Sequence, residues 1–290
     1  MRIEGYGRVD RDAPLSFSLD GKTYGGFSGD TLASALLAND VRLMGRSFKY
    51  HRPRGVLTAG SEEPNALVTI GDEPNLRAPM VELYDGLVAA SQNCWPSLRY
   101  DLLSANDLGA PFLSAGFYYK TFMWPRAFWE KVYEPAIRRA AGLGALSGAP
   151  NADIYEKAFA FCDVLVIGAG PSGLIAALSA AEAGADVILC DEGPVFGGQL
   201  LSEDEEVGDL PGHVWAADMV DRLRAMDNVR LMQRTTVTGA YDQGTFGAVE
   251  RVGVHLAEAP EGLPRECFWR IAAQRAVLTA GAIERPIAFA

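Results

Sequence analysis

The stretch Asp163-Val164-Leu165-Val166-Ile167-Gly168-Ala169-Gly170-Pro171-Ser172-Gly173 decides the fold of the second half of this chain. Its first residues form a continuous apolar run, which is typical of a strand buried on both faces. Three glycines follow at the spacing G-x-G-x-x-G, and the small residues from Pro171 to Ala183 favour a helix that ends at Gly184. A strand, a glycine-rich turn and a helix in this order predict a dinucleotide-binding unit.

Each residue of the glycine-rich turn has a physical task in such a unit. Gly168 allows the tight turn, Gly170 lets a pyrophosphate approach the backbone, and Gly173 lets the helix pack against the strand. Pro171 and Ser172 open the helix, whose N-terminal N–H groups and positive dipole end favour phosphate. We therefore expect Gly168, Gly170, Pro171, Ser172 and Gly173 to bind a cofactor.

An acidic residue stands where the second strand ends. Residues 186–190 form this strand, and Asp191 follows it 18 residues after Gly173. A carboxylate at this place accepts hydrogen bonds from a ribose hydroxyl and repels a 2′-phosphate. Because no arginine follows within Glu192-Gly193-Pro194, the sequence predicts NAD or FAD rather than NADP. The loop itself does not distinguish these two, since both present an ADP moiety.

The remaining pattern of the second half predicts a mixed sheet. A helix over 213–226 and a strand over 229–232 continue the α/β alternation. The segments 236–241, 248–256 and 268–272 then alternate with period two, as in an antiparallel meander, and 275–279 is a further buried strand. Together with Gly197-Gly198-Gln199 and the ending Thr279-Ala280-Gly281, this arrangement resembles the two-dinucleotide flavoproteins with a glutathione-reductase-like fold.

The first half predicts a small α+β unit. Two strands flank Asp20-Gly21, which is a hairpin signal. A helix follows over 28–39, with Asp30 or Ser28 as N-cap, Leu32, Leu36 and Leu37 as the buried stripe and Asn39 at its end. Residues 66–70 form a later strand.

An aromatic-rich connecting segment follows this unit. Aromatic residues are dense over 117–129, a helix is expected over 134–141, and 144–152 resembles a linker. The aromatic side chains either form a core between domains or lie on a surface that a partner subunit covers.

Charge and composition exclude several classes of function. A net charge of -11 argues against a general nucleic-acid or anionic-membrane partner. The run 164–181 carries no charge, but glycines and a proline near its start favour a buried strand and helix over a membrane span. The N-terminus lacks the apolar region of a signal peptide. Four dispersed cysteines contain no C-x-x-C pair, so a reducing, cytoplasmic location and the absence of a metal site are expected.

Three segments narrow the resemblance. Residues 45–55, 62–68 and 115–125 look like the alpha subunits of heterotetrameric sarcosine oxidases. The resemblance implies a flavin enzyme that demethylates sarcosine to glycine, with hydrogen peroxide and either formaldehyde or 5,10-methylenetetrahydrofolate as products. It also implies an NAD on the alpha subunit, FAD and FMN on or shared with a partner, the amine site on the beta subunit, and gamma and delta subunits as further partners. No catalytic residue is then expected on this chain.

The resemblance also assigns site residues. Asp191 and Glu192 would lie at the adenosine ribose, Gly198 and Gln199 along the diphosphate, Val237 at the adenine, and Gly281 on the far side, and Gly193 is a further expected cofactor-binding residue. The family's N-terminal unit resembles plant-type ferredoxins, and relatives hold a [2Fe–2S] cluster there with C-x4-C-x2-C spacing. Because Thr58, Glu63 and Ala66 stand at these positions, the unit is expected to be cluster-free.

The expected organisation is a cluster-free β-grasp ferredoxin-like domain over 1–95, the connecting segment over 96–155, and a Rossmann-like domain over 156–290. Family members are several times longer, so the chain is expected to be a fragment or split subunit, with an incomplete nucleotide domain and no folate site. Two alternatives stay open: a stand-alone FAD- or NAD-dependent oxidoreductase, and a non-catalytic scaffold that its nucleotide stabilises. The basic segment 42–54 has three readings: a solvated face, a contact with an acidic partner or a flavin phosphate, and RNA binding.

Overall fold

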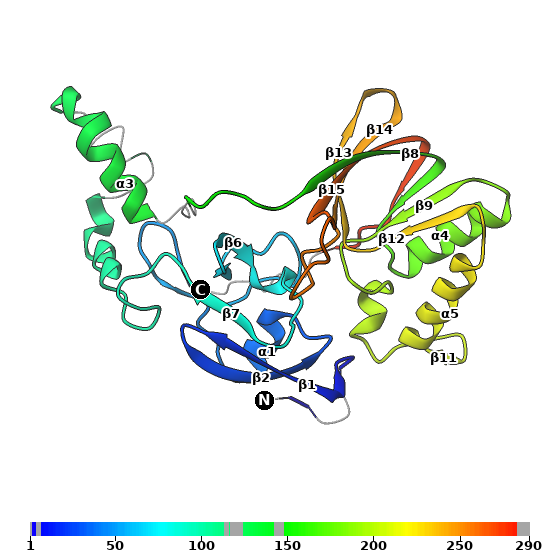
Figure 1. Ribbon diagram of the computed structural model, residues 1–290, viewed down its shortest axis with the longest axis horizontal. Helices are drawn as coiled ribbons and strands as arrows, with labels where there is room; N and C mark the ends of the chain where they lie inside the picture. Colours follow the sequence, from blue (N-terminus) through cyan, green and yellow to red (C-terminus); the bar gives the residue numbers. More distant parts are fainter. Residues whose placement is uncertain (1, 4–6, 113–115, 117–123, 142–147, 283–290) are drawn as a thin grey trace. The chain divides into compact units, whose positions relative to one another are not determined.

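The computed structural model describes the chain apart from residues 1, 4–6, 113–115, 117–123, 142–147 and 283–290 (Figure 1). It forms two compact units, one including Val9–Pro150 and the other including Arg8 and the described residues from Asn151 onward. The described part of the expected connecting segment groups with the first unit as far as Pro150. Most of the aromatic stretch, 117–123, lies outside the described residues.

The first unit is built on a five-stranded sheet in the order β2-β1-β7-β5-β6. The expected hairpin is confirmed: β1 and β2 are antiparallel and join at Asp20 and Gly21, whose φ angles of 50° and 76° suit a tight turn. Strand β7 runs parallel to β1 and antiparallel to β5. Strand β6 pairs antiparallel with β5 and is the last strand on that side of the sheet. The strands are β1 (Asp10–Leu19), β2 (Lys22–Ser28), β5 (Leu67–Ile70), β6 (Glu73–Arg77) and β7 (Leu87–Ser91).

Helix α1 (Leu32–Ala38) packs on this sheet, but its N-cap is not one of the expected residues. Thr31 caps it, with its hydroxyl accepting the Ser34 N–H at 3.2 Å. Asp30 instead accepts the Ser34 hydroxyl at 2.7 Å and the Phe27 N–H at 2.9 Å, so it fixes the turn before the helix. Asn39 is the C-cap, as expected.

The buried stripe of α1 is narrower than expected. Leu32 and Leu36 are fully buried, whereas Leu37 is 45% exposed, because it lies one residue past the face that meets the sheet. The other elements of this unit are the short pair β3 (Gly45–Arg46) and β4 (Pro53–Arg54), η1 (Ala78–Met80), η2 (Leu102–Phe112), η3 (Arg126–Phe128), η4 (Trp129–Tyr133) and α3 (Glu134–Ala141). The helix expected over 134–141 is therefore confirmed.

The second unit contains a six-stranded sheet in the order β12-β9-β8-β15-β14-β13. The strands β8 (Tyr155–Ile167), β9 (Val187–Cys190) and β12 (Val229–Met232) are parallel. Helices α4 (Pro171–Glu182) and α5 (Gly212–Arg224) connect them, lie side by side in Figure 1, and share one core with Val166 and Leu189. Leu165 and Ile188 point to the opposite face, where they pack with residues of the meander.

The meander is confirmed, with two corrections. Strands β13 (Thr235–Tyr241), β14 (Thr245–Arg251) and β15 (Glu266–Leu278) are successively antiparallel. The segments expected as two strands, 268–272 and 275–279, form the single strand β15, because both halves pair in parallel with the equally long β8. Strand β14 starts at Thr245 and ends at Arg251 rather than at residue 256.

The short elements η5 (Gly198–Leu201), β10 (Glu206–Val207), β11 (Leu210–Pro211) and η6 (Asp242–Gly244) complete the described fold. None of the helices in the described part of the chain has the length and apolar character needed to cross a bilayer.

Candidate dinucleotide-binding site

The glycine-rich turn lies at the carboxyl end of β8 and is held by the strands beside it. Gly168 donates its N–H to the Cys190 carbonyl at 2.8 Å and has a φ angle of 101°. Its missing side chain matters, because a Cβ there would lie 2.5 Å from the Thr279 carbonyl oxygen. A residue with a side chain therefore cannot make this turn without moving β15 or the residues after it.

Gly173 and Gly170 serve different purposes. A Cβ on Gly173 would lie 1.9 Å from the Gly168 carbonyl oxygen, so this glycine is needed for packing. A Cβ on Gly170 would meet nothing nearer than the Gly198 Cα at 4.0 Å, so the protein leaves space in front of this residue. Gly170 is the N-cap of α4, Pro171 lacks an N–H, and no side chain among the described residues caps the helix. This open and uncapped helix end fits a diphosphate.

Asp191 ties the turn to the end of β9. Its carboxylate accepts the Ala169 N–H at 2.7 Å on one oxygen and the Gly193 N–H at 2.7 Å on the other. Each carboxylate oxygen has a further lone pair, so these bonds leave capacity for ribose hydroxyls. The sequence predicts that Asp191 contacts the ribose; in the structure its carboxylate positions the turn.

The second glycine pair closes the other side of the turn. Gly197 donates its N–H to the Ala169 carbonyl at 2.9 Å, and Gly198 packs so closely on Gly170 that a Cβ there would lie 2.8 Å from the Gly170 Cα. Gln199 is exposed in η5 directly after this contact. The expected diphosphate residues Gly198 and Gln199 therefore lie at the first glycine loop.

Thr279 holds the glycine-rich turn in place, and the sequence alone did not predict this role. Its hydroxyl donates to the carbonyls of Gly168 at 2.8 Å and Ile167 at 3.0 Å, and this anchors the end of β15 to the turn. The ending Thr279-Ala280-Gly281 was noted as a family signal, but its bonding required the fold. Gly281 itself is exposed, and a Cβ on it would meet no atom within 4 Å.

Two further residues near Asp191 come from the meander. Thr235 donates its N–H to the Asp191 carbonyl at 2.7 Å, and the β13–β14 register shifts between Val237 and Gly239, beside the expected adenine contact. Arg251 donates from Nη2 to the Glu192 carbonyl at 2.5 Å. The prediction of NAD or FAD over NADP used the lack of an arginine within residues 192–194. Arg251 was not considered there, because it lies 59 positions after Glu192 in the sequence.

The thiols of Cys162 and Cys190 belong to the core of this unit. Burial raises the pKa of the Cys190 thiol to about 12 and that of Cys162 to about 11. Both therefore stay protonated at neutral pH and behave as core residues. A hollow lined by Phe161, Asp163 and Asp186 lies toward the amino ends of the parallel strands, away from the turn. Ligands of such sheets bind at the carboxyl ends.

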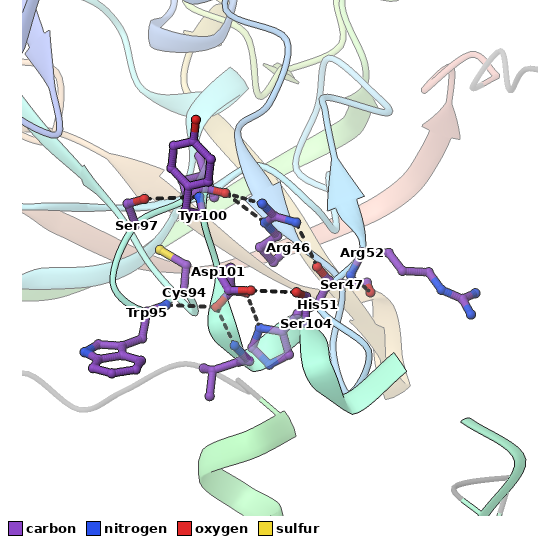
Figure 2. A network of polar contacts seen from close by, with 12 residues as sticks. Arg46, Ser47, His51, Arg52, Cys94, Trp95, Ser97, Tyr100, Asp101 and Ser104 are labelled. Atoms are coloured by element: carbon purple, nitrogen blue, oxygen red, sulfur yellow. Dashed lines mark hydrogen bonds and ion pairs between the residues drawn. The ribbon is translucent and has the colours of Figure 1, made fainter. Parts of the chain in front are cut away.

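Much of the basic segment in the first unit is used internally (Figure 2). Arg46 donates to the Leu98 carbonyl at 2.9 Å and to the Arg99 carbonyl at 3.0 Å, and Arg52 pairs with Asp107 at 2.6 Å. His51 and Asp101 form a fully buried pair with 2.7 Å between Nδ1 and Oδ2. Asp101 also accepts the backbone N–H of Trp95 at 2.9 Å. These contacts join residues 46–52 to residues 95–107, so this segment has a structural role.

Comparison with known proteins first defines a class. Residues 12–94 match the family described as a 2Fe-2S iron-sulfur cluster binding domain, and residues 163–253 match the FAD dependent oxidoreductase family. The structure of an L-proline dehydrogenase from P. horikoshii superposes with a TM-score of 0.57 at 19% identity, over 96% of this chain and 42% of that chain. The fold is thus a ferredoxin-like unit followed by a flavoprotein-type nucleotide-binding unit.

The particular relatives are then clear. The chain is 58% identical to sarcosine oxidase subunit alpha of Rhizobium meliloti (strain 1021), over 99% of this chain and 30% of the relative. It is 35% identical to the subunit of the same name from Corynebacterium sp. (strain U-96), over 97% of this chain and 25% of the relative. The resemblance to sarcosine oxidase alpha subunits is confirmed, and the chain corresponds to their N-terminal portion, less than a third of their length.

Proposed function

We propose that this chain is the NAD-binding N-terminal part of the alpha subunit of a flavin-dependent sarcosine oxidase. The single observation that carries this proposal is the 58% identity over nearly the whole chain to a sarcosine oxidase alpha subunit. The geometry of the glycine-rich turn supports the nucleotide-binding part. The reaction would convert sarcosine to glycine, with hydrogen peroxide and either formaldehyde or 5,10-methylenetetrahydrofolate.

The nucleotide would be held mainly by backbone. Gly168, Gly170, Pro171, Ser172 and Gly173 form the diphosphate cradle at the uncapped end of α4. Asp191, Glu192 and Gly193 lie on the ribose side, because Asp191 is bonded to Ala169 within the same turn. Gly198 and Gln199 line the diphosphate from the second loop. Val237 and Gly281 extend the site toward the adenine and the far end, and their assignment rests on the family resemblance.

This chain supplies binding and assembly rather than the chemical step. A bound NAD or FAD would supply an adenine dinucleotide whose redox-active end extends beyond the turn. We assign no side chain of this chain to proton or hydride transfer. Amine oxidation is proposed for a beta subunit holding FAD and FMN, with gamma and delta subunits as further partners, and no cluster is assigned to the first unit.

A specific observation favours a second candidate. The family that matches residues 163–253 is an FAD dependent oxidoreductase family, so FAD in the same turn is the alternative to NAD. Denaturing the purified chain and identifying the released nucleotide by absorbance and mass distinguishes them. Release of NAD supports the first proposal, and release of FAD supports the second. NADP or no adenine nucleotide would contradict both.

The division of labour has its own test. The purified chain should not oxidise sarcosine alone, and oxygen consumption with sarcosine should appear when flavin-bearing subunits are added. Sarcosine oxidation by the chain alone, with added FAD, would refute the assignment of the amine site to a partner.

A further inference from the structure

A buried carboxylate lies at the centre of the loop 57–66 in the first unit. Glu63 is 1% exposed. Its Oε2 accepts the N–H groups of Leu57 and Thr58, both at 2.7 Å, and its Oε1 accepts those of Asn65 at 2.7 Å and Ala66 at 3.0 Å. No lysine, arginine or histidine pairs with Glu63 within the described ranges of the chain. Four backbone amides therefore compensate the burial of this charge.

The position of this carboxylate in the chain is informative. Thr58, Glu63 and Ala66 have the spacing x4 and x2 at which plant-type ferredoxins place three cluster-ligating cysteines. The surrounding residues 12–94 match a 2Fe-2S cluster binding family. Thiolates are the ligands that such a cluster requires, and here a hydroxyl, a carboxylate and a methyl group replace them. The residues of this loop do not fit a [2Fe–2S] cluster.

The backbone of the loop nevertheless surrounds an anion. An iron–sulfur cluster is a group whose sulfur atoms accept hydrogen bonds from the protein around it. In this loop the four converging N–H groups meet carboxylate oxygens. We propose that the Glu63 carboxylate replaces an iron–sulfur cluster as a built-in anion, and that it holds the loop 57–66 in its ligand-binding shape without metal.

Neighbouring backbone segments pack against the outside of the loop 57–66 and limit how far it can move. Because the loop cannot collapse inward freely, its inward-facing amides depend on the Glu63 carboxylate as their acceptor. A Cβ on Gly45 would lie 2.1 Å from the Asn65 carbonyl oxygen, which shows how closely β3 approaches the loop. Ala78 donates its N–H to the Ala66 carbonyl at 2.9 Å. Thr58 is 8% exposed and Ala66 is 0% exposed, so water cannot readily take over the amides of these two residues if the carboxylate is removed. Glu63 is accordingly a positioning residue for the loop 57–66.

The test compares two isosteric substitutions in neighbouring positions of the full chain. Glu63→Gln keeps the shape of the side chain but replaces one oxygen by an NH2 group, which faces N–H donors. Glu62→Gln removes the same charge from an exposed residue and is the matched control. We expect Glu63→Gln to lower the Tm of the first unit by about 10 °C or more, and Glu62→Gln to leave it within about 2 °C.

Hydrogen exchange gives a local readout that general loss of stability does not mimic. In native conditions well below Tm, the amides of Leu57, Thr58, Asn65 and Ala66 should exchange slowly in the wild type and at least tenfold faster in Glu63→Asp, whose shorter side chain cannot reach all four. Peptides of α1, in the same unit, should change much less than those of the loop 57–66. Equal protection of this loop in the wild type and in Glu63→Asp would overturn the proposal.

Metal uptake is the independent arm. Anaerobic incubation of the wild-type chain with ferrous iron and sulfide, followed by desalting, should leave less than about 0.1 iron per chain and no visible cluster absorbance. Retention of two iron atoms and two sulfides per chain would overturn the proposal, whatever the variants show.

Discussion

Gly170 and Gly173 provide a paired test of the nucleotide site, because the same substitution should act on different properties. A methyl group on Gly170 has open space up to 4.0 Å, and the φ of −70° and ψ of −176° suit alanine. Gly170→Ala should therefore change the free energy of unfolding by less than about 1 kcal/mol. A methyl group on Gly173 would lie 1.9 Å from a backbone oxygen, so Gly173→Ala should cost about 2–3 kcal/mol or more.

The effect of Gly170→Ala should appear in binding. The added methyl group occupies the space that the diphosphate needs, and it forces the phosphate away from the helix end. Loss of one charge-assisted hydrogen bond costs about 1.5–3 kcal/mol, which corresponds to roughly a 10- to 150-fold weaker Kd. The assay is calorimetric titration of the nucleotide-free chain with NAD and separately with FAD, together with the Tm without ligand. An unchanged Kd in a folded Gly170→Ala variant would refute the reasoning.

Four other outcomes are expected. Asp191→Ala should lower the free energy of unfolding of the second unit by about 2–4 kcal/mol, because it leaves two amides without an acceptor, and chemical denaturation measures this. His51→Ala should destabilise the first unit by about 3 kcal/mol through its buried partner, without changing the Kd for nucleotide in the second unit. Burial raises the pKa of Cys190 from 9.0 to about 12. At pH 8 its thiolate population is therefore about 1,000-fold below that of an ordinary thiol. Alkylation of Cys190 by iodoacetamide should be slower by at least that factor in the folded chain. Thr58→Val should leave the Tm unchanged or raise it, because the Thr58 hydroxyl is buried and has no hydrogen-bond partner in the part of the chain that the structure describes.

Glycine spacing and turn residues in the sequence correctly predicted the elements that short-range interactions determine. The glycine turn, its flanking strand and helix, and the Asp20-Gly21 hairpin were correct because spacing and turn chemistry alone determine them. The helix cap was wrong, since Asp30, Thr31 and Ser28 are all good caps and the tertiary bonds of Asp30 decide between them. The continuity of β15 was missed, because pairing with the long β8 determines it rather than any pattern within residues 266–278.

In the candidate site, too, the sequence predicted the residues within one short segment and missed the contacts between distant segments. Gly168, Gly170 and Gly173 were identified by spacing, and the structure gives each a distinct contact. The bonds of Thr279 to the turn and of Arg251 to Glu192 could not be predicted, because they join segments that are 111 and 59 positions apart. Glu63 was noted only as a missing cysteine, and its four amide partners became visible once the loop was folded around it.

The central claim is that the backbone of the turn at the end of β8 binds the diphosphate of an adenine dinucleotide. Hydrogen exchange of the chain with and without saturating NAD, and with and without FAD, tests this claim most directly. The account predicts that one of these nucleotides slows exchange in peptides covering 168–173 and 197–199. Protection confined to other peptides, such as those lining the hollow at Phe161 and Asp163, or no protection by either nucleotide, would contradict it.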